Sequence, residues 1–251
     1  MKFKELVWKL LPEGRYAIYN EVKVPESSAP KKNFNFLPDK LSPNKPDYKW
    51  HYISFIRKYV ENKERVVIIG GGRGVSSVVA ARQAGSQGQV IIFEGSPEMF
   101  DRINNTLKIN RVEEICQLQQ KIVGPGIEVY TENETFEVKN PQDLDYCNVL
   151  FMDCQGAEMK ILNKINFDPE KIIAEMHPYR YMKDSNRTIA PDEFIDELKN
   201  RDYSQFEFKH SKEKEENISE KRMRKLLKIK YRQKKGQRRA GIGTLSVFAK
   251  K

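Results

Sequence analysis

The sequence has few cysteines and no long apolar run. Its three cysteines, Cys116, Cys147 and Cys154, form no CxxC pair and leave one thiol over, which is typical of a reducing compartment. The sequence contains no run of about 18 apolar residues that could span a membrane, and its opening residues are too charged for a secretion signal. We therefore expect a cytoplasmic protein, and its 251 residues suit one α/β domain with additions.

Apolar residues are also sparse, at 39% of the chain against 32% charged residues. This balance indicates a folded core that carries a strongly polar segment. The net charge of +10 locates that segment, because 14 Lys and Arg but only 4 Glu lie between Lys209 and Arg239. The rest of the chain sums to about zero, so an anionic partner would be bound through this segment.

The first 47 residues lack the pattern of long helices and strands. After a short amphipathic helix at the start, they are interrupted by prolines at positions 25, 30, 38, 43 and 46. We predict an irregular arm or lid here, followed by a helix from Trp50 to Val60, where apolar residues recur at helical spacing. The chain would then divide into an arm with a leading helix, residues 1–60, and a domain of residues 61–251 with a basic insert at 212–240.

From residue 65 onward, apolar runs alternate with helical patterns. The run Arg65–Ile69 (RVVII) is typical of a parallel strand buried on both faces. Further strands are predicted at Gln89–Glu94, Ile115–Val123, Asn148–Asp153, Lys171–Met176, Tyr203–Lys209 and Gly243–Ala249. Helices are predicted at Val75–Ala84, Pro97–Asn110, Ala157–Ile165 and Pro191–Arg201. The alternation indicates an α/β fold with a doubly wound parallel sheet.

A glycine-rich loop, Gly70-Gly71-Gly72-Arg73-Gly74, joins the first strand to its helix. Such a junction points backbone N–H groups at an anion or a carboxylate, although a tight turn without a ligand is the alternative. Dinucleotide sites need G-x-G-x-x-G, whereas the spacing here is G-x-G-x-G and Val75 replaces the third glycine. Glu94 ends the next strand, where it could accept hydrogen bonds from two ribose hydroxyls or simply face solvent. The glycine spacing favours S-adenosylmethionine over NAD.

Three blocks follow one another in the middle of the chain: VVIIGGGRGVSSVVAARQAGSQGQVIIFEGSPEMFDRINNTLKIN (Val66–Asn110), NVLFMDCQGAEMKIL (Asn148–Leu162) and IIAEMHP (Ile172–Pro178). The block Asn148–Leu162 is similar to a D-x-E-G-A-E motif, and the block Ile172–Pro178 is similar to a strand that ends in an acid and a histidine. Together the three blocks resemble the FkbM family of S-adenosylmethionine-dependent methyltransferases, which have the class I, Rossmann-like fold. The resemblance implies a seven-stranded sheet with an antiparallel last strand, and methylation of a hydroxyl on a sugar-containing or other small molecule.

The resemblance also implies a set of cofactor-binding residues: Gly70, Gly72 and Gly74 at the methionine end, with Gly71 between them, Glu94 at the ribose, and Lys121 and Ile122 near the adenine. Two positions depart from the family pattern. Ile68 stands where an acid often holds the amino group of the cofactor. Gln155 replaces the first glutamate of the motif, and its amide cannot act as a base.

Asp153 and His177 are the candidate bases. Methyl transfer to a hydroxyl needs an acceptor in line with the methyl group and a base that takes its proton. Both residues follow strands whose carboxyl ends share one edge of the sheet. Glu158 joins them as a supporting catalytic residue, Asp153 also belongs to the cofactor set, and Glu175 and His177 are the candidates for substrate contact. Alternatively, Asp153 caps a helix and His177 packs under the lid.

A metal is left unassigned. An Asp, a Glu and a His at one edge could hold a divalent ion that lowers the pKa of a hydroxyl, but no spacing demands one. Cys154, next to Asp153, is interpreted as a small buried residue rather than a nucleophile.

The basic insert has Met223, Leu226, Leu227 and Tyr231 at near-helical spacing among cations, within Ile218–Arg239. This pattern predicts a basic amphipathic helix, which could lie peripherally on an anionic membrane, bind nucleic acid or dock on its own domain. Its connection should leave the sheet at the cofactor edge. We therefore expect the insert to overhang the substrate entrance and to favour phosphate-bearing or other acidic substrates.

Three interpretations of function remain. The first is an O-methyltransferase for a small-molecule or glycan substrate. The second is an RNA methyltransferase whose insert holds phosphates, although the sequence has neither an aromatic strand motif for base stacking nor an Asn/Asp-Pro-Pro-aromatic block. The third is a catalytically weak adaptor that binds anionic surfaces. An NAD oxidoreductase fits the glycine spacing worst.

Overall fold

The computed structural model describes residues 16–25, 44–124, 137–154, 156–176, 193–212, 217–232 and 245–251. Three of the predictions fall outside these residues: the helix at the start of the chain, the role of Gln155 and the role of His177.

The core of the molecule is a seven-stranded sheet in the order β11-β12-β10-β9-β4-β5-β6. Its strands are β4 (Arg65–Ile69), β5 (Gln89–Phe93), β6 (Cys116–Gln119), β9 (Val149–Met152), β10 (Lys171–Met176), β11 (Gln205–His210) and β12 (Leu245–Lys250). Neighbouring strands are parallel except that β12 is antiparallel to both β10 and β11. The predicted doubly wound, Rossmann-like sheet with an antiparallel last strand is therefore confirmed.

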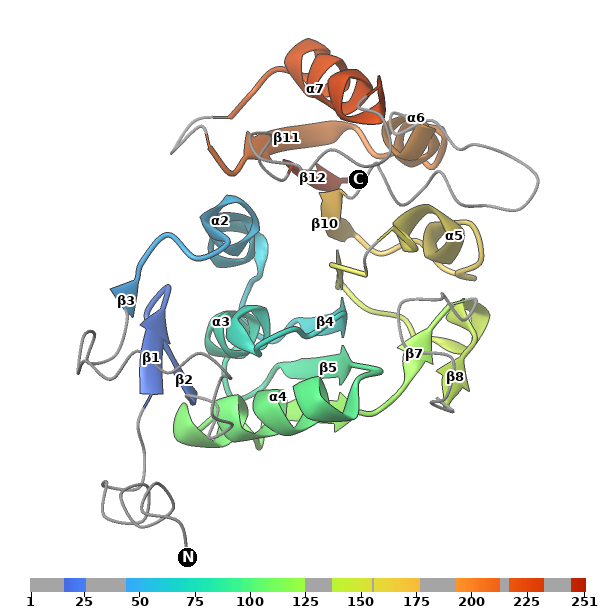
Figure 1. Cartoon of the computed structure of the whole chain (residues 1–251). Helices are drawn as coiled ribbons and strands as arrows, with labels where there is room; N and C mark the ends of the chain where they lie inside the picture. The colour runs from blue at the N-terminus through green and yellow to red at the C-terminus, as the bar shows by residue number, and fades with distance from the viewer. Residues whose placement is uncertain are drawn as a thin grey trace, which may run out of the picture.

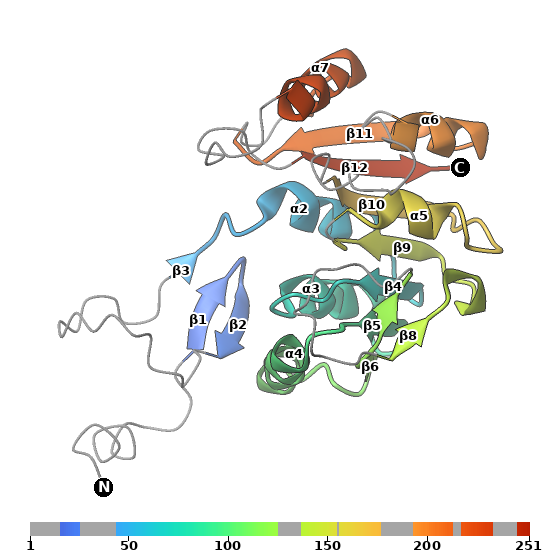
Figure 2. The ribbon, with the colours of Figure 1, turned by 45° about the vertical axis from the view of Figure 1, so that its right-hand side comes forward.

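Helices cover both faces of this sheet (Figure 1). One face packs against α2 (Trp50–Tyr59), α3 (Val75–Ala84) and α4 (Pro97–Ile109), and the other packs against α5 (Glu158–Leu162) and α6 (Glu193–Asn200). The turned view in Figure 2 shows the same two layers. The predicted helices are thus present with ends that differ by a few residues. No helix in the described ranges is both long enough and apolar enough to cross a membrane.

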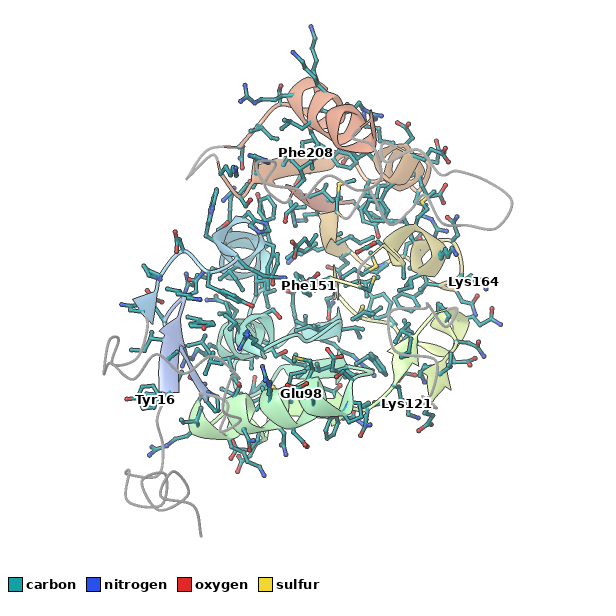
Figure 3. All side chains as sticks on the ribbon, in the orientation of Figure 1. Tyr16, Glu98, Lys121, Phe151, Lys164 and Phe208 are labelled. Atoms are coloured by element: carbon teal, nitrogen blue, oxygen red, sulfur yellow. The ribbon has the colours of Figure 1, made fainter. Side chains whose placement is uncertain are left out.

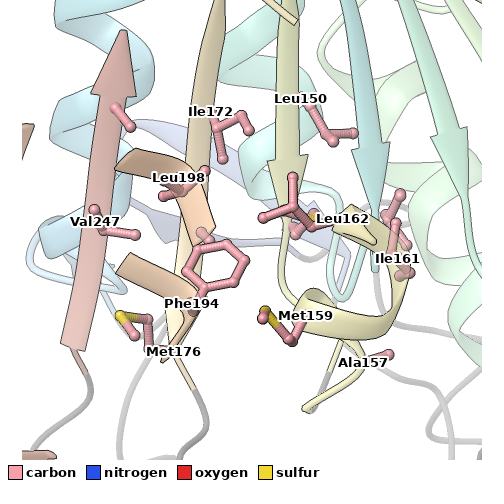
Figure 4. Packing of buried hydrophobic residues seen from close by; sticks show 14 of the residues in the cluster. Leu150, Ala157, Met159, Ile161, Leu162, Ile172, Met176, Phe194, Leu198 and Val247 are labelled. Carbon is pink, nitrogen blue, oxygen red and sulfur yellow. The ribbon is translucent and has the colours of Figure 1, made fainter. Parts of the chain in front are cut away.

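Two apolar clusters, one on each face, hold the layers together. On the α2 side, the ring of Phe151 packs edge-on against Tyr52 at a centroid distance of 5.0 Å, and Phe248 stacks on Tyr59. Figure 4 shows the opposite cluster, in which Phe194 and Leu198 of α6 lie over the sheet. Burial of one such side chain contributes roughly 1.5–3 kcal/mol to folding. Because helices cover both faces of the sheet, side chains on both faces of a central strand are buried, and this explains the continuous apolar runs in the sequence.

The N-terminal region contains a β-hairpin where the sequence predicted irregular structure. Strands β1 (Tyr16–Tyr19) and β2 (Val22–Pro25) pair antiparallel, and β3 (Asn44–Lys45) pairs with β1. Asn20 and Glu21 form the turn with φ of 52° and 68°, which suits a two-residue hairpin. Proline spacing had suggested an irregular arm, but residues alternate in burial along both strands, and β2 packs against α3 and α4.

The third predicted strand, Ile115–Val123, is in fact two strands in different sheets. Strand β6 ends at Gln119, and β7 (Ile122–Val123) pairs with β8 (Val138–Lys139) in a separate two-stranded sheet. The cause lies in the neighbouring strand. The last hydrogen bond to β6 comes from the N–H of Glu94 to the carbonyl of Gln119, and beyond that point β6 has no strand to pair with.

The basic insert is helical, as predicted, at α7 (Glu220–Arg232). The chain leaves β11 at the edge of the sheet where β10 also ends, because His210 pairs with Leu245 and Leu245 pairs with Met176. Met223 of α7 is fully buried, and Arg224 forms an ion pair with Asp196 of α6. The first turns of α7 are therefore docked on their own domain.

Candidate functional site

Polar residues meet at the carboxyl edge of the parallel strands. Ile69 pairs with Phe93 on one side and with Met152 on the other, so the residues that follow them lie side by side. These are Gly70, Glu94 and Asp153. In β10, Glu175 comes one residue after the partner of Met152 and continues the row. The topology thus brings together residues from four separate parts of the sequence, as the rule for doubly wound sheets requires.

An open cavity of about 210 Å³ lies at this edge. It is lined by Lys49, Ile69, Gly70, Gly72, Phe93, Glu94, Gly95, Lys121, Ile122, Val123, Asp153, Cys154 and Ala157. Six of the residues predicted for the cofactor are among them: Gly70, Gly72, Glu94, Lys121, Ile122 and Asp153.

Gly70 and Gly72 both line the cavity. Gly70 has a φ of 89°, and a Cβ atom there would lie 2.2 Å from the carbonyl oxygen of Asp153. Gly72 has a φ of 56°, yet a Cβ atom there would meet no protein atom within 4 Å. Gly70 is thus required by the fold, whereas the space beside Gly72 is open to a ligand.

Gly71 and Gly74 do not line the cavity, although both were predicted to contact the cofactor. A Cβ atom at Gly71 would lie 2.5 Å from Ile103, and one at Gly74 would lie 3.0 Å from Thr106. Both neighbours belong to α4. These two glycines let the loop and the start of α3 pack closely on that helix. They therefore fix the position of the loop without lining the cavity.

Glu94 is buried, and its carboxylate ties the cavity wall together. One oxygen accepts a hydrogen bond from the N–H of Gly72 at 3.2 Å, and the other accepts from the N–H of Ser96 at 3.0 Å. Ser96 in turn caps α4 by accepting from the N–H of Met99. These hydrogen bonds orient the carboxylate of Glu94 at the cavity wall.

Lys49 is a site residue that the sequence did not reveal. Its Nζ lies 2.5 Å from Oδ2 of Asp153 and 2.8 Å from Oε2 of Glu175. The Lys49 side chain is 30% exposed and lines the cavity, whereas that of Glu175 is 2% exposed and lies behind it. The predicted substrate residue Glu175 therefore reaches the cavity through Lys49.

The charge of Lys49 is held firmly. Burial lowers the pKa of its ammonium group, but Tyr52, Asp153 and Glu175 raise it, and the net result is a pKa above the ordinary lysine value. Burial also raises the pKa of the Tyr52 hydroxyl well above its usual range. At neutral pH the site therefore contains a cationic lysine and a neutral tyrosine, and Lys49 cannot serve as a proton acceptor.

Local backbone geometry places Lys49 at this point. It is the N-cap of α2 with a left-handed conformation, φ 49° and ψ 33°, which is uncommon for a residue with a side chain. Farther along α2, His51 hydrogen-bonds Ser246 at 2.6 Å and Ser54 accepts from Lys209 at 2.7 Å. Three positions of the helix thus meet polar groups on the sheet, and these contacts fix its register.

The remaining predicted residues are placed as follows. Glu158 is fully buried at the start of α5 and does not line the cavity. Lys121 lines the cavity and forms an ion pair with Glu137 at 2.6 Å, on the side marked by its label in Figure 3. Cys154 also lines it; burial, followed by the charges of Glu158 and Asp153, raises the pKa of its thiol, so it stays uncharged. His177 lies outside the described residues.

The chain has no group of three or more His, Cys, Asp or Glu side chains suited to a metal ion within its described ranges. A role for a metal therefore stays unassigned.

No protein-family model and no curated protein matches this sequence. Among solved structures, it is similar to an S-adenosylmethionine-dependent O-methyltransferase from Thermotoga maritima, with 15% identity, a TM-score of 0.45 and coverage of 79% of this chain and 64% of that one. It is also similar to an O-methyltransferase from Bacillus cereus in complex with SAH, with 12% identity, a TM-score of 0.45 and coverage of 79% of this chain and 80% of that one. A third similar structure is the O-methyltransferase TomG from Streptomyces achromogenes in complex with SAM. It has 13% identity and a TM-score of 0.47, with coverage of 85% of this chain and 83% of that one. The chain thus spans just under two thirds of the Thermotoga protein.

Proposed function

We propose that this protein is a methyltransferase that uses S-adenosylmethionine. The observation that carries the proposal is the open cavity at the carboxyl edge of the sheet, which is lined both by Gly72, where a Cβ atom would meet no protein atom, and by the buried Glu94. The G-x-G-x-G spacing supports the same cofactor. We further propose, from the three sequence blocks, that the protein is a member of the FkbM family, with residues 61–251 as the methyltransferase domain. From its cysteine content and the lack of a long apolar run in the sequence, we propose that it is cytoplasmic.

The lining residues fit this cofactor from end to end. The open space at Gly72 suits the amino-acid end, and Glu94 suits the two ribose hydroxyls. Lys121 and Ile122, on the β6 side of the cavity, would contact the adenine. When bound, S-adenosylmethionine supplies an electrophilic methyl group on a cationic sulfur.

We propose a hydroxyl on a small molecule or glycan as the methyl acceptor. Asp153 lies at the cavity beside Lys49 and would take the hydroxyl proton as the acceptor oxygen forms its bond to the methyl carbon; the electron pair of the broken bond stays on the sulfur. The ammonium of Lys49 orients Asp153 and stabilises negative charge on the acceptor oxygen. His177 stays a predicted second base, and Glu158 would act only by supporting Cys154 and α5.

Calorimetry tests the cofactor. We expect S-adenosylmethionine and S-adenosylhomocysteine each to bind at one site per chain, and NAD to bind at least tenfold more weakly. Glu94→Gln should weaken S-adenosylhomocysteine about tenfold, the order expected for a charged hydrogen-bond acceptor. The matched control is Glu98→Gln, because Glu98 is an exposed acid on α4 that pairs with Arg102. Absence of binding, or a preference for NAD, would refute the proposal.

An RNA substrate is the second candidate, and the exposed cations of α7 favour it. Lys221, Arg222 and Lys225 are exposed, while Met223 anchors the same helix to the domain. Cations held on a docked helix can track phosphates, and such binding weakens steeply with salt. A gel-shift assay with single-stranded RNA at physiological salt decides between the two. Micromolar binding that is lost when these three cations become Glu would favour RNA over a small molecule.

A further inference from the structure

The ionic cluster of Lys49, Asp153 and Glu175 places one ammonium group between two carboxylates. Asp153 and Lys49 line the cavity, and Glu175 stands behind them. A change at any of the three therefore alters the charge at this end of the site by one unit.

The strand order places this cluster at the opposite end of the cavity from the proposed adenine contacts. Lys121 and Ile122 follow β6, Glu94 follows β5, and Gly70 follows β4, whereas Asp153 follows β9 and Glu175 lies in β10. A cofactor with its ribose at Glu94 and its adenine beyond would direct its sulfur toward Asp153 and Lys49. This step rests on the proposed function.

We propose that Lys49 and Asp153 together set how strongly the site prefers the cationic methyl donor over the neutral product. S-adenosylmethionine and S-adenosylhomocysteine differ by one methyl group and one positive charge. A carboxylate near the sulfur stabilises the cation, and the ammonium of Lys49 opposes it. Lys49 thus limits the preference for the donor, and Asp153 creates it.

Titration calorimetry with both ligands gives the ratio of their affinities without any methyl acceptor. Asp153→Asn should lower the preference for S-adenosylmethionine about fivefold, the order of one unit charge several ångströms away in a partly wet site. Lys49→Met should raise it by about the same factor. The control is Lys58→Met, which removes a cation from the same helix at an ion pair with Glu207, outside the cavity.

A double variant separates charge from damage to the fold. Lys49→Met alone leaves two neighbouring carboxylates that tend to share a proton, and this reduces its effect. Lys49→Met with Glu175→Gln removes one positive and one negative charge, so the affinity ratio should return to within about twofold of the wild-type value. Thermal unfolding verifies that each variant is folded.

The outcomes are distinct. If both ligands bind but neither Asp153→Asn nor Lys49→Met changes the ratio of their affinities, the inference is wrong and the proposed function stands. If neither ligand binds to the wild-type protein, both fail. Should Lys49→Met not fold, Asp153→Asn alone decides, since a ratio within twofold of the wild-type value overturns the inference.

Discussion

The carbonyl oxygen of Asp153 lies so close to Gly70 that a side chain at position 70 would come within 2.2 Å of it. The two residues end neighbouring strands, and their backbones are locked by the hydrogen bond from the N–H of Asp153 to the carbonyl of Ile69. The glycine loop and the candidate base are therefore one rigid unit rather than two loops that happen to meet.

Gly70→Ala should strongly destabilise the protein. The added Cβ atom clashes with backbone that cannot turn away, and the φ of 89° is unfavourable for alanine. We expect a loss of about 3–5 kcal/mol in the free energy of unfolding, measured by urea denaturation. A loss below about 1 kcal/mol would mean that the loop and Asp153 separate easily.

Gly72→Ala should do the opposite, with little effect on stability but a large one on binding. Its Cβ meets no protein atom, so only the backbone penalty of about 1 kcal/mol applies. The methyl group extends into the cavity, and we expect S-adenosylhomocysteine to bind at least about tenfold more weakly in calorimetry. Gly85→Ala is the control for binding alone, because Gly85 has a φ of 69° and does not line the cavity; its Cβ atom would lie 2.6 Å from the Asn62 side chain, so a loss of stability is expected there. Equal binding by both variants would contradict this use of Gly72.

Met223→Ala should loosen α7. The side chain is fully buried against the sheet and α6, and its removal leaves a cavity that costs about 2–4 kcal/mol in unfolding free energy. Lys225→Ala on the exposed side of the same helix should change stability by less than about 0.5 kcal/mol. Thermal unfolding of the two variants compares them directly. Similar melting temperatures would show that α7 does not depend on this contact.

Lys171→Met should destabilise the other edge of the sheet. The buried ammonium of Lys171 bonds Glu61 at 2.7 Å and Glu64 at 2.9 Å, and Glu64 is itself buried. Without the lysine, Glu64 would be left as a buried acid, at a cost of about 3 kcal/mol in the urea unfolding free energy. Lys63→Met on the adjoining turn is the control and should be nearly neutral.

The stabilisation by Lys171 should also be lost at alkaline pH. Burial lowers the pKa of Lys171, but its hydrogen bonds to Glu61 and Glu64 raise the pKa by more than burial lowers it. The folded-state pKa therefore lies above the unfolded value of about 10.4. The stabilisation is therefore complete below that pH and is lost as the pH rises through the folded value. The stability difference between wild type and Lys171→Met should be constant from pH 7 to about pH 10 and shrink above it. A decrease already by pH 9 would contradict the assignment.

The sequence predicted the sheet well because its strands are buried on both faces and leave continuous β-branched runs. Six of the thirteen cavity-lining residues were also predicted, and Gly70, Glu94 and Asp153 among them directly follow such runs. Lys49 could not, because 104 residues separate it from Asp153 and no local pattern marks it. The hairpin was missed for a related reason. Prolines on either side of it dominate the local pattern, whereas the hairpin depends on long-range contacts, chiefly the packing of β2 against α3 and α4.

The hairpin also bears on which parts of the chain can be exchanged. Asn110 of α4 donates to the carbonyl of Lys23 at 2.7 Å and accepts from its N–H at 3.2 Å, and β1 in turn pairs with β3 just before Lys49. A shortened chain starting at residue 61 would keep every strand of the large sheet and the glycine loop, yet it would lose the ammonium that Asp153 and Glu175 share. Chimeras that join this sheet to the N-terminal segment of a relative would therefore exchange part of the candidate site, even though the junction lies outside the glycine loop.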